Sequence, residues 1–363
     1  MIRALLAAAL LLQDGMPPRN EPWRSLPWHV SVLEARAQAL REKKPVYLWA
    51  AVGHPLGAGS AHVIVDRTVF KDPRVSDRIR KGFIPVAVDQ TYQRNQHDPE
   101  GDFYRSIVVQ GPRNNVKANT SGHYVFSPDG KLLGFAAEDA GPDEFVKLLD
   151  GATFTFVDAP KIENGSPDRY FHRTFPEGGI AVLVTTRVLG GYGATDDRRV
   201  AAVQQAVGWD YLWIRKDEAE ALAQGRWPES VQRRMLQWHL TTPNVGAAWG
   251  WAPEEIRKAD LAVEGGRLRG SFVLEAPAGS KGFTSGRGFE GTVTGTIESK
   301  GGKVTRFDVV AKGTAWGKHE NGGWPPRTKY PFVAVFTLAD AADPFARRVP
   351  PNGMRAPEDG YLR

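Results

Sequence analysis

The chain has no cysteine among its 363 residues. A thiolate is the nucleophile of every thiol–disulfide exchange step, so the chain cannot perform that chemistry by itself. Long apolar runs are also missing. No segment of the sequence approaches the roughly 18 consecutive apolar residues that cross a bilayer. We therefore expect neither redox cysteines nor a stable membrane span in the mature chain.

A dominant charge of one sign is missing as well. Lysine and arginine total 47 against 41 aspartates and glutamates, which gives a formal net charge of +6. The basic residues form short scattered groups, such as Arg78–Lys81 and Arg233–Arg234, rather than one stripe interleaved with aromatic residues. This pattern argues against a nucleic-acid partner. The composition is that of a globular chain, and its length suffices for two domains.

The first residues have the pattern of an export signal. Met1–Arg3 is a cationic start, Ala4–Leu12 supplies nine apolar residues, and Gln13–Gly15 ends the run. We therefore expect a signal peptide over residues 1–15 and a periplasmic or extracellular protein. A disordered or helical N-terminus of a cytoplasmic protein is the alternative. Residues 16–27 are proline-rich and predict a linker.

Residues 28–152 have the pattern of an α/β domain. Leucine and alanine recur at helical spacing until Lys43-Lys44-Pro45 ends the first helix, and a continuous apolar run typical of a buried central strand follows. Asp72 and Pro73 fit the N-cap and the first residue of another helix. The predicted elements are a helix at 33–42, a strand at 46–50, a helix from 72, a strand at 83–88, a hairpin at 122–135 and a helix at 142–149.

This order of elements resembles the thioredoxin-like superfamily. The resemblance rests on Lys44-Pro45 before the central strand, on Phe70–Val75 with its Asp-Pro helix start, and on the Ser127–Lys131 hairpin turn. In that family the central strand opens into a redox loop whose Cys-x-x-Cys lies in the first turn of the next helix. The corresponding loop here, Ala51–His62, has no sulfur, and the family's cis-proline would fall at Ser121. The resemblance therefore implies the fold without the redox chemistry.

What remains for such a domain is recognition. Active members bind extended peptide in the groove beside the dithiol, so the resemblance implies a non-catalytic module that binds a protein or an extended peptide of the cell envelope, without a cofactor. A degenerate member of a thiol–disulfide oxidoreductase family is an alternative. The residues expected to form the binding surface are Gly53, His54, Pro55, Gly57, Ser60, His62, Ser121 and Gly122.

The same loop could in principle hold a catalytic or metal site. A serine–histidine pair needs a third group that orients the histidine, and the sequence around Ser60 and His62 shows none. A metal site needs three or four converging ligands, which the spacing of His54, His62 and Asp66 does not impose. We therefore predict no catalytic residue and no metal ligand.

Residues 153–175 are rich in turn formers and predict a linker to a second domain over 176–355. Helical and strand patterns alternate at first, and period-two strands follow, which predicts an α+β domain that ends in an antiparallel meander. The expected fold class is therefore α/β plus α+β. The predicted strands lie at 180–186, 211–214, 267–275, 289–298, 304–312 and 332–338.

Most of the tryptophans lie in this second domain. Trp249, Trp251 and Trp324 stand in loop-like contexts, and exposed tryptophan stacks on sugar rings. A carbohydrate-binding or hydrolytic protein with its site on this domain is therefore the second functional hypothesis. Paired carboxylates such as Glu254-Glu255 are adjacent and would point apart on a helix, so they give no glycosidase signal.

Overall fold

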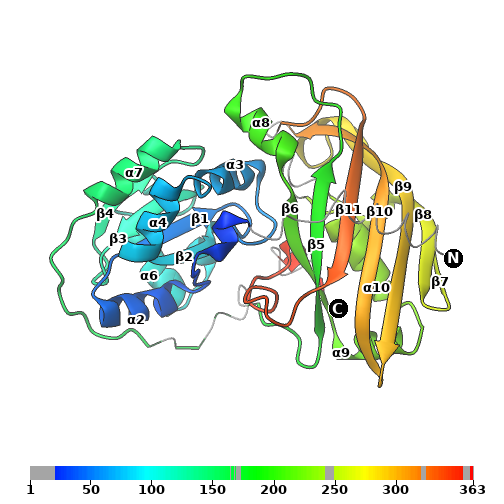
Figure 1. Ribbon diagram of the computed structural model, residues 1–363, viewed down its shortest axis with the longest axis horizontal. Coiled ribbons are helices and arrows are strands. Elements are labelled where there is room, and N and C mark those ends of the chain that lie inside the picture. The colour runs from blue at the N-terminus through cyan, green and yellow to red at the C-terminus, as the bar shows by residue number, and fades with distance from the viewer. Residues whose placement is uncertain are drawn as a thin grey trace. The chain divides into compact units, whose positions relative to one another are not determined.

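The structure of the protein is a computed structural model that describes residues 21–163, 165–166, 168, 173–241, 249–319, 324–354 and 360–362. The chain divides at Arg173 and Thr174 into two compact units, called here the N-terminal unit and the C-terminal unit (Figure 1). The expected signal peptide, residues 1–15, lies outside the described residues.

The N-terminal unit is built on a four-stranded mixed sheet in the order β2-β1-β3-β4. Strand β1 (Val46–Ala51) lies in the middle, parallel to β2 (Ile84–Asp89) and antiparallel to β3 (Gly122–Phe126), and β3 pairs antiparallel with β4 (Leu132–Ala136). The helices are η1 (Pro22–Ser25), α2 (Val32–Glu42), α3 (Ala61–Val69), α4 (Pro73–Gly82), α5 (Gln90–Asn95), α6 (Pro99–Val108) and α7 (Pro142–Gly151).

Local sequence explains where several of these helices begin and end. The Ser31 side chain accepts a hydrogen bond from Glu34 N at the start of α2, and Lys43 ends it in the left-handed conformation. The Asp72 side chain accepts a hydrogen bond from Arg74 N, and Pro73 is the first residue of α4. The helices and strands expected in this unit are confirmed.

Two layers of helices cover the sheet because β1 is apolar on both faces. Val46, Leu48 and Ala50 join a buried cluster with residues of α2 and α6. Tyr47 and Trp49 alternate with them and point to the other face, where Trp49 lies 5.1 Å from the Phe70 ring. The result is a sheet between helical layers, with a fully buried central strand.

Two segments differ from expectation. The sequence predicts a linker over residues 16–27, but Trp23 is 1% exposed and lies under the Arg67 guanidinium, whose carbon is 4.2 Å from the ring centre. The contact between the Trp23 indole and the Arg67 guanidinium holds this proline-rich segment against the N-terminal unit. Composition alone does not predict such a contact. Residues 90–95 and 99–108, over which the sequence pattern predicts no element, form α5 and α6.

The C-terminal unit is a seven-stranded antiparallel sheet in the order β6-β5-β11-β10-β9-β8-β7 (Figure 1). The coarse architecture expected from the sequence, mixed α/β followed by an antiparallel sheet, is confirmed. The strands are β5 (Ile180–Val188), β6 (Gly208–Ile214), β7 (Ile256–Glu264), β8 (Arg267–Ala276), β9 (Phe283–Lys300), β10 (Lys303–His319) and β11 (Tyr330–Leu338). The helices are α8 (Arg198–Gln205), α9 (Lys216–Ala223), α10 (Glu229–Arg234) with the π-helical turn η2 (Met235–His239), and the 3-10 turns η4 (Pro253–Glu255), η5 (Ser280–Gly282) and η6 (Asn352–Met354).

Alternation along β9 separates a dry face from a wet one. Phe289 and Val293 have no exposed surface, whereas Glu290 and Thr292 between them are exposed. Helical elements pack on the dry face, since the His239 ring lies 6.5 Å from Phe336. Among the described residues no helix is both long enough and apolar enough to cross a bilayer.

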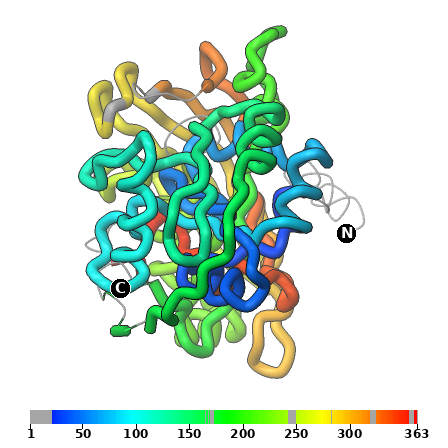
Figure 2. The backbone as a smooth tube through the Cα atoms, turned by 90° about the vertical axis from the view of Figure 1, so that its left-hand side faces the viewer, coloured from blue at the N-terminus to red at the C-terminus, as the bar shows by residue number. Residues whose placement is uncertain are grey.

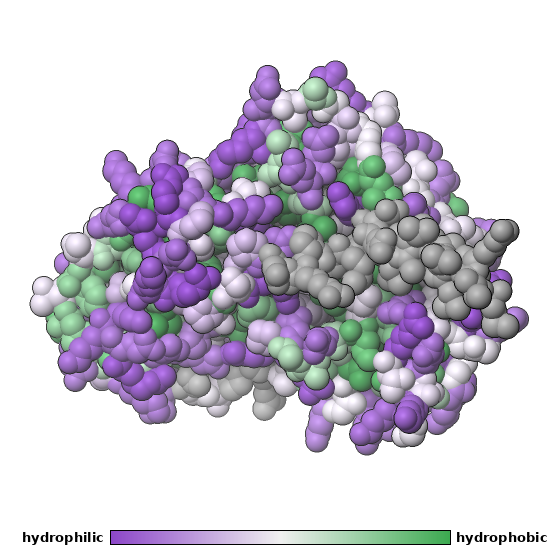
Figure 3. Space-filling view, viewed as in Figure 1, coloured by the Kyte–Doolittle hydropathy of each residue, from purple (hydrophilic) through white to green (hydrophobic). Residues whose placement is uncertain are grey.

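Hydrophilic residues cover most of the face seen in Figure 3. The exposed large hydrophobic residues of the described chain are Val109, Val157 and Trp249. They are isolated side chains rather than one apolar patch, and single exposed apolar residues are ordinary on a protein surface.

Replacing Phe145 by alanine should destabilise the N-terminal unit by about 3–5 kcal/mol, because it leaves a cavity in the core. Phe145 is fully buried, with its ring 4.5 Å from the His123 ring. Urea unfolding followed by tryptophan fluorescence measures the loss. Phe156→Ala, at a half-buried position, is the matched control and should cost much less. Equal effects of the two variants would contradict this description of the core.

Candidate functional site

The loop expected to carry the binding surface folds back on itself. Ser60 N donates to Val52 O at 2.9 Å, and Gly53 forms an isolated bridge with Gly59. The Arg67 guanidinium of α3 donates from Nη2 to Pro55 O and Gly57 O, both at 2.7 Å. The loop therefore uses several of its own backbone groups internally. Gly53 is required here, because a Cβ at its φ of +79° would lie 2.3 Å from Ala58 O.

His54 is buried inside this loop. Its Nδ1 accepts a hydrogen bond from Leu56 N at 3.2 Å. Burial, together with the nearby charge of Arg67, lowers the pKa of His54 to about 3, so the ring is neutral at physiological pH. His54 therefore supports the loop, and its binding role stays a prediction.

Ser121 and Gly122, the second part of the expected binding surface, are also buried. Ser121 donates from its backbone N and its Oγ to Asn119 Oδ1, at 2.8 Å and 2.6 Å. Gly122 faces the ring of Phe135, where a Cβ would meet Cε2 at 2.5 Å. Of the eight residues expected to bind, Ser60 and His62 are half-buried and the other six are buried.

His62 is the outer end of a chain of polar groups that the sequence does not reveal. Its Nδ1 lies 2.8 Å from Asp139 Oδ2, and Asp139 N donates to Asp66 Oδ1 at 2.8 Å. The other oxygen of Asp66 lies 3.2 Å from Nε2 of His123, whose Nδ1 is hydrogen-bonded to the Tyr47 hydroxyl at 2.9 Å. We call this set, His62, Asp139, Asp66, His123 and Tyr47, the polar chain.

The inner part of the polar chain is closed to solvent. Asp66, His123 and Tyr47 have no exposed surface, and burial, followed by the charge of Asp66, raises the pKa of Tyr47 well above its ordinary value. The sequence holds one signal for it, because His123 interrupts an otherwise apolar strand. Strand pattern alone cannot identify the partners of His123, which come from α3 and β1.

The structure supplies the orienting group that the sequence around His62 does not show, but not a nucleophile. Asp139 orients His62 in the way that an acid orients the base of a catalytic triad. Ser60 Oγ, however, is buried and has no hydrogen-bond partner among the described residues, so it is not bonded to His62. A serine site therefore lacks the hydroxyl–imidazole contact that activates the oxygen.

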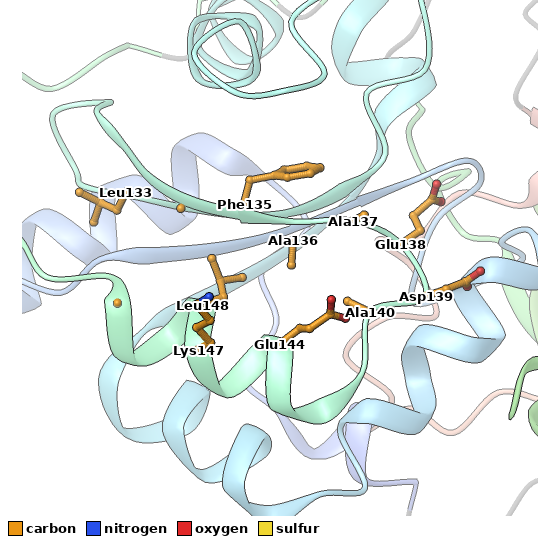
Figure 4. Close-up of a pocket in the computed structure, with 12 residues that line it drawn as sticks. Leu133, Phe135, Ala136, Ala137, Glu138, Asp139, Ala140, Glu144, Lys147 and Leu148 are labelled. Carbon is orange, nitrogen blue, oxygen red and sulfur yellow. The ribbon is translucent and has the colours of Figure 1, made fainter.

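A groove lies next to the outer end of the polar chain, between β4 and α7. Its volume is about 660 Å³. Figure 4 shows Phe135 pointing to the face away from α7, and Glu144, Lys147 and Leu148 reaching the groove from α7. We call it the β4 groove. It is lined by Leu133, Gly134, Phe135, Ala136, Ala137, Glu138, Asp139, Ala140, Glu144, Lys147, Leu148 and Gly151.

The two edges of this sheet differ. The backbone of His29 covers the β2 edge, since His29 N donates to Pro85 O at 2.9 Å and Ala87 N donates to His29 O at 3.0 Å. Within the described part of the chain, the backbone of Leu133–Ala136 pairs with β3 alone, so the other edge of β4 has no partner strand. This side of the unit, with α7, faces the viewer in Figure 2.

Carboxylates gather at one end of the β4 groove. Glu138, Asp139 and Glu144 line it, against one cation, Lys147. Burial, followed by the charge of Asp66, raises the pKa of Glu138, whose Oε2 lies 3.3 Å from an Arg113 nitrogen. A further cation beside Glu138 would favour its charged form.

The tryptophans of the C-terminal unit do not form an exposed cluster in the described residues. Trp209, Trp213 and Trp251 are buried, and Trp249 is 45% exposed. Glu255 accepts hydrogen bonds from Ser280 Oγ and Ala252 N, so it has local structural partners. His239 is buried at the end of η2, with Nε2 2.6 Å from the Tyr361 hydroxyl and Nδ1 3.0 Å from Asp210.

Comparison with protein-family models, curated proteins and solved structures gives no match for this chain. The functional argument therefore rests on the chain's own geometry.

The pair of His62 and Asp139 should make stability depend on pH. The hydrogen bond to Asp139 raises the pKa of His62 above its unfolded value of about 6.5, so the pair stabilises the fold fully below that pH and ceases to do so as pH rises through the folded pKa. His62→Gln should therefore lower the melting temperature at pH 5.5 and have little effect at pH 9. Because His62 is 36% exposed, the loss should stay within about 1 kcal/mol.

Thermal unfolding over this pH range tests the assignment. His97→Gln is the matched control, because His97 is exposed and has no ion pair within the described residues. An effect of His62→Gln that is constant across pH would contradict the role given to the pair.

Proposed function

We propose that the N-terminal unit is a thioredoxin-like module without redox chemistry, and that it binds an extended peptide as an added strand along the free edge of β4. The observation that carries this proposal is the unpaired edge beside the β4 groove.

The order and directions of the strands support the thioredoxin-like assignment. The order is β2-β1-β3-β4, with β3 alone running against the other three. Helices α3 and α4 connect β1 to β2, and α7 follows the β3–β4 hairpin. The order of these elements along the chain is the one on which the resemblance rests. The loop after β1 has no sulfur. From the resemblance we therefore carry over peptide binding and not thiol–disulfide exchange.

Strand addition suits this edge because backbone groups at a free strand edge can pair with another chain. An added strand gains main-chain hydrogen bonds along the edge, while pockets for alternate side chains provide selectivity. Leu148 and Ala136 line the adjacent groove and offer apolar contact to such side chains. The site differs from the surface expected from the sequence, and His62 connects the two through Asp139.

Charge favours a peptide that carries lysine or arginine. Three carboxylates and one lysine line the groove, and Glu138 is partly desolvated. A cationic side chain beside Glu138 would gain Coulomb energy in a site that is less screened than open surface. We therefore propose a cationic extended segment of a cell-envelope protein as the partner, in keeping with the expected export.

Fluorescence anisotropy with a labelled ten-residue peptide of alternating valine and lysine tests the proposal. This peptide should bind the full chain saturably. The same peptide with glutamate for lysine should bind weakly, because the acidic groove repels it. A fully N-methylated version should not bind, because it has no backbone donors for the β4 edge. Equal binding of the N-methylated peptide would exclude strand addition.

Two charge variants locate the site on the chain. Glu138→Lys should weaken binding of the lysine peptide about tenfold. Lys147→Glu should strengthen it about twofold to fivefold, because it removes the one cation of the groove. Glu42→Lys, on α2, has the same charge change as the first variant outside the groove and should leave affinity unchanged. Loss of binding in all three variants, or in none, would place the site elsewhere.

A further inference from the structure

The C-terminal unit has a pocket of its own, at the end of the sheet where β5 and β11 meet. Its volume is about 580 Å³, within the ordinary range for small-molecule sites. We call it the cationic pocket. It is lined by Arg187, Val188, Leu189, Gly190, Tyr192, Gln204, Lys312 and Pro331.

The sheet register places both cations of this pocket in one row. Lys312 of β10 is opposite Val333 of β11, and Val333 is opposite Arg187 of β5. Residues directly opposite on neighbouring strands point to the same face. Strands are about 4.8 Å apart, so the two Cα atoms lie roughly 10 Å apart across Val333. An anion above Val333 would lie between the two positive side chains.

The positive charge of Arg187 is not neutralised by a partner among the described residues. None of the described lining residues is acidic, and Arg187 has no ion pair or hydrogen bond of its side chain among the described residues. Arg187 and Lys312 are both half-buried, so their heads are less screened than on open surface. A planar guanidinium binds a carboxylate through two parallel hydrogen bonds, which makes an anion the natural occupant.

The rest of the lining is apolar or neutral. Leu189 packs against the buried cluster of Val310, Val333 and Val335, and this cluster forms an apolar base beside the cations. Gln204 of α8 supplies an amide, while the hydroxyl of Tyr192 is already used, since it donates to Trp324 O at 2.7 Å. A ligand that satisfies this lining has one negative group and an apolar body.

We propose that the cationic pocket binds a small organic carboxylate, whose negative group lies between Arg187 and Lys312 and whose apolar part contacts Leu189 and Pro331. This inference rests on the C-terminal unit alone and is independent of peptide binding by the N-terminal unit. It also differs from the sugar-stacking hypothesis, because a charged pair rather than an exposed tryptophan recognises the ligand.

Titration of the full chain with benzoate and with benzamide, followed by NMR chemical shifts or calorimetry, tests the proposal. The two probes have nearly the same shape and differ in charge. Benzoate should bind saturably, at least tenfold tighter than benzamide, and its affinity should fall as ionic strength rises. Equal affinity for the two probes, or no saturable binding of benzoate, would overturn the proposal.

Substitutions then assign the binding to this pocket. Arg187→Gln and Lys312→Gln should each weaken benzoate binding about tenfold, whereas Arg187→Lys should weaken it less than Arg187→Gln, because it keeps the positive charge and loses the two parallel hydrogen bonds. Arg267→Gln is the matched control, because Arg267 is exposed on β8 of the same sheet and outside the pocket. Unchanged binding in both pocket variants, with melting temperatures that show them folded, would overturn the assignment.

Discussion

Each backbone N–H and C=O group that leaves water needs a hydrogen-bond partner, and this requirement decides how the N-terminal unit is closed. The loop after β1 meets it internally, through the Ser60–Val52 hydrogen bond and the guanidinium of Arg67. The backbone of His29 meets it along the β2 edge. Beyond Leu132, whose N–H donates to Gln110 Oε1 at 3.0 Å, the second edge of β4 has no such partner among the described residues. At the rest of this edge the backbone groups are left to water or to a strand from another chain, and the candidate binding site lies there.

The same requirement applies to the buried side chains, and both units meet it in a similar way. In the N-terminal unit His123 lies between Asp66 and Tyr47, and in the C-terminal unit His239 lies between Asp210 and Tyr361. Each set joins elements that are far apart in the sequence. Buried polar groups of this kind add little net stability, but removing one partner leaves the others unsatisfied. They therefore restrict how the helices pack against the sheet.

The two proposed sites have opposite charge. The β4 groove has three carboxylates and one lysine, whereas the cationic pocket has an arginine and a lysine and no described acid. The formal net charge of +6 predicts neither arrangement, because it sums residues that the fold places on separate surfaces. A chain with both sites could bind a basic peptide with one unit and a small anion with the other.

The local elements follow from short-range patterns in the amino-acid sequence. Ser31, Asp72 and Pro73 set helix starts, and alternation along 289–298 predicts the dry and wet faces of β9, because caps and side-chain periodicity act between near neighbours. The absence of cysteine excludes disulfide exchange on composition alone. The sequence does not predict strand β7, because Arg257, Lys258 and Asp260 interrupt apolar alternation in its first half.

Which side chains meet depends on how the strands and helices pack in three dimensions. His62 is a candidate from the sequence, but its partner Asp139 is 77 residues away, in the connection between β4 and α7. Arg187 and Lys312 have no signal in the sequence, because they come together through the register of three strands. The free edge of β4 likewise follows from the strand order, because β4 is the last strand of the sheet. Long-range register and packing have no local signature, and both candidate sites depend on them.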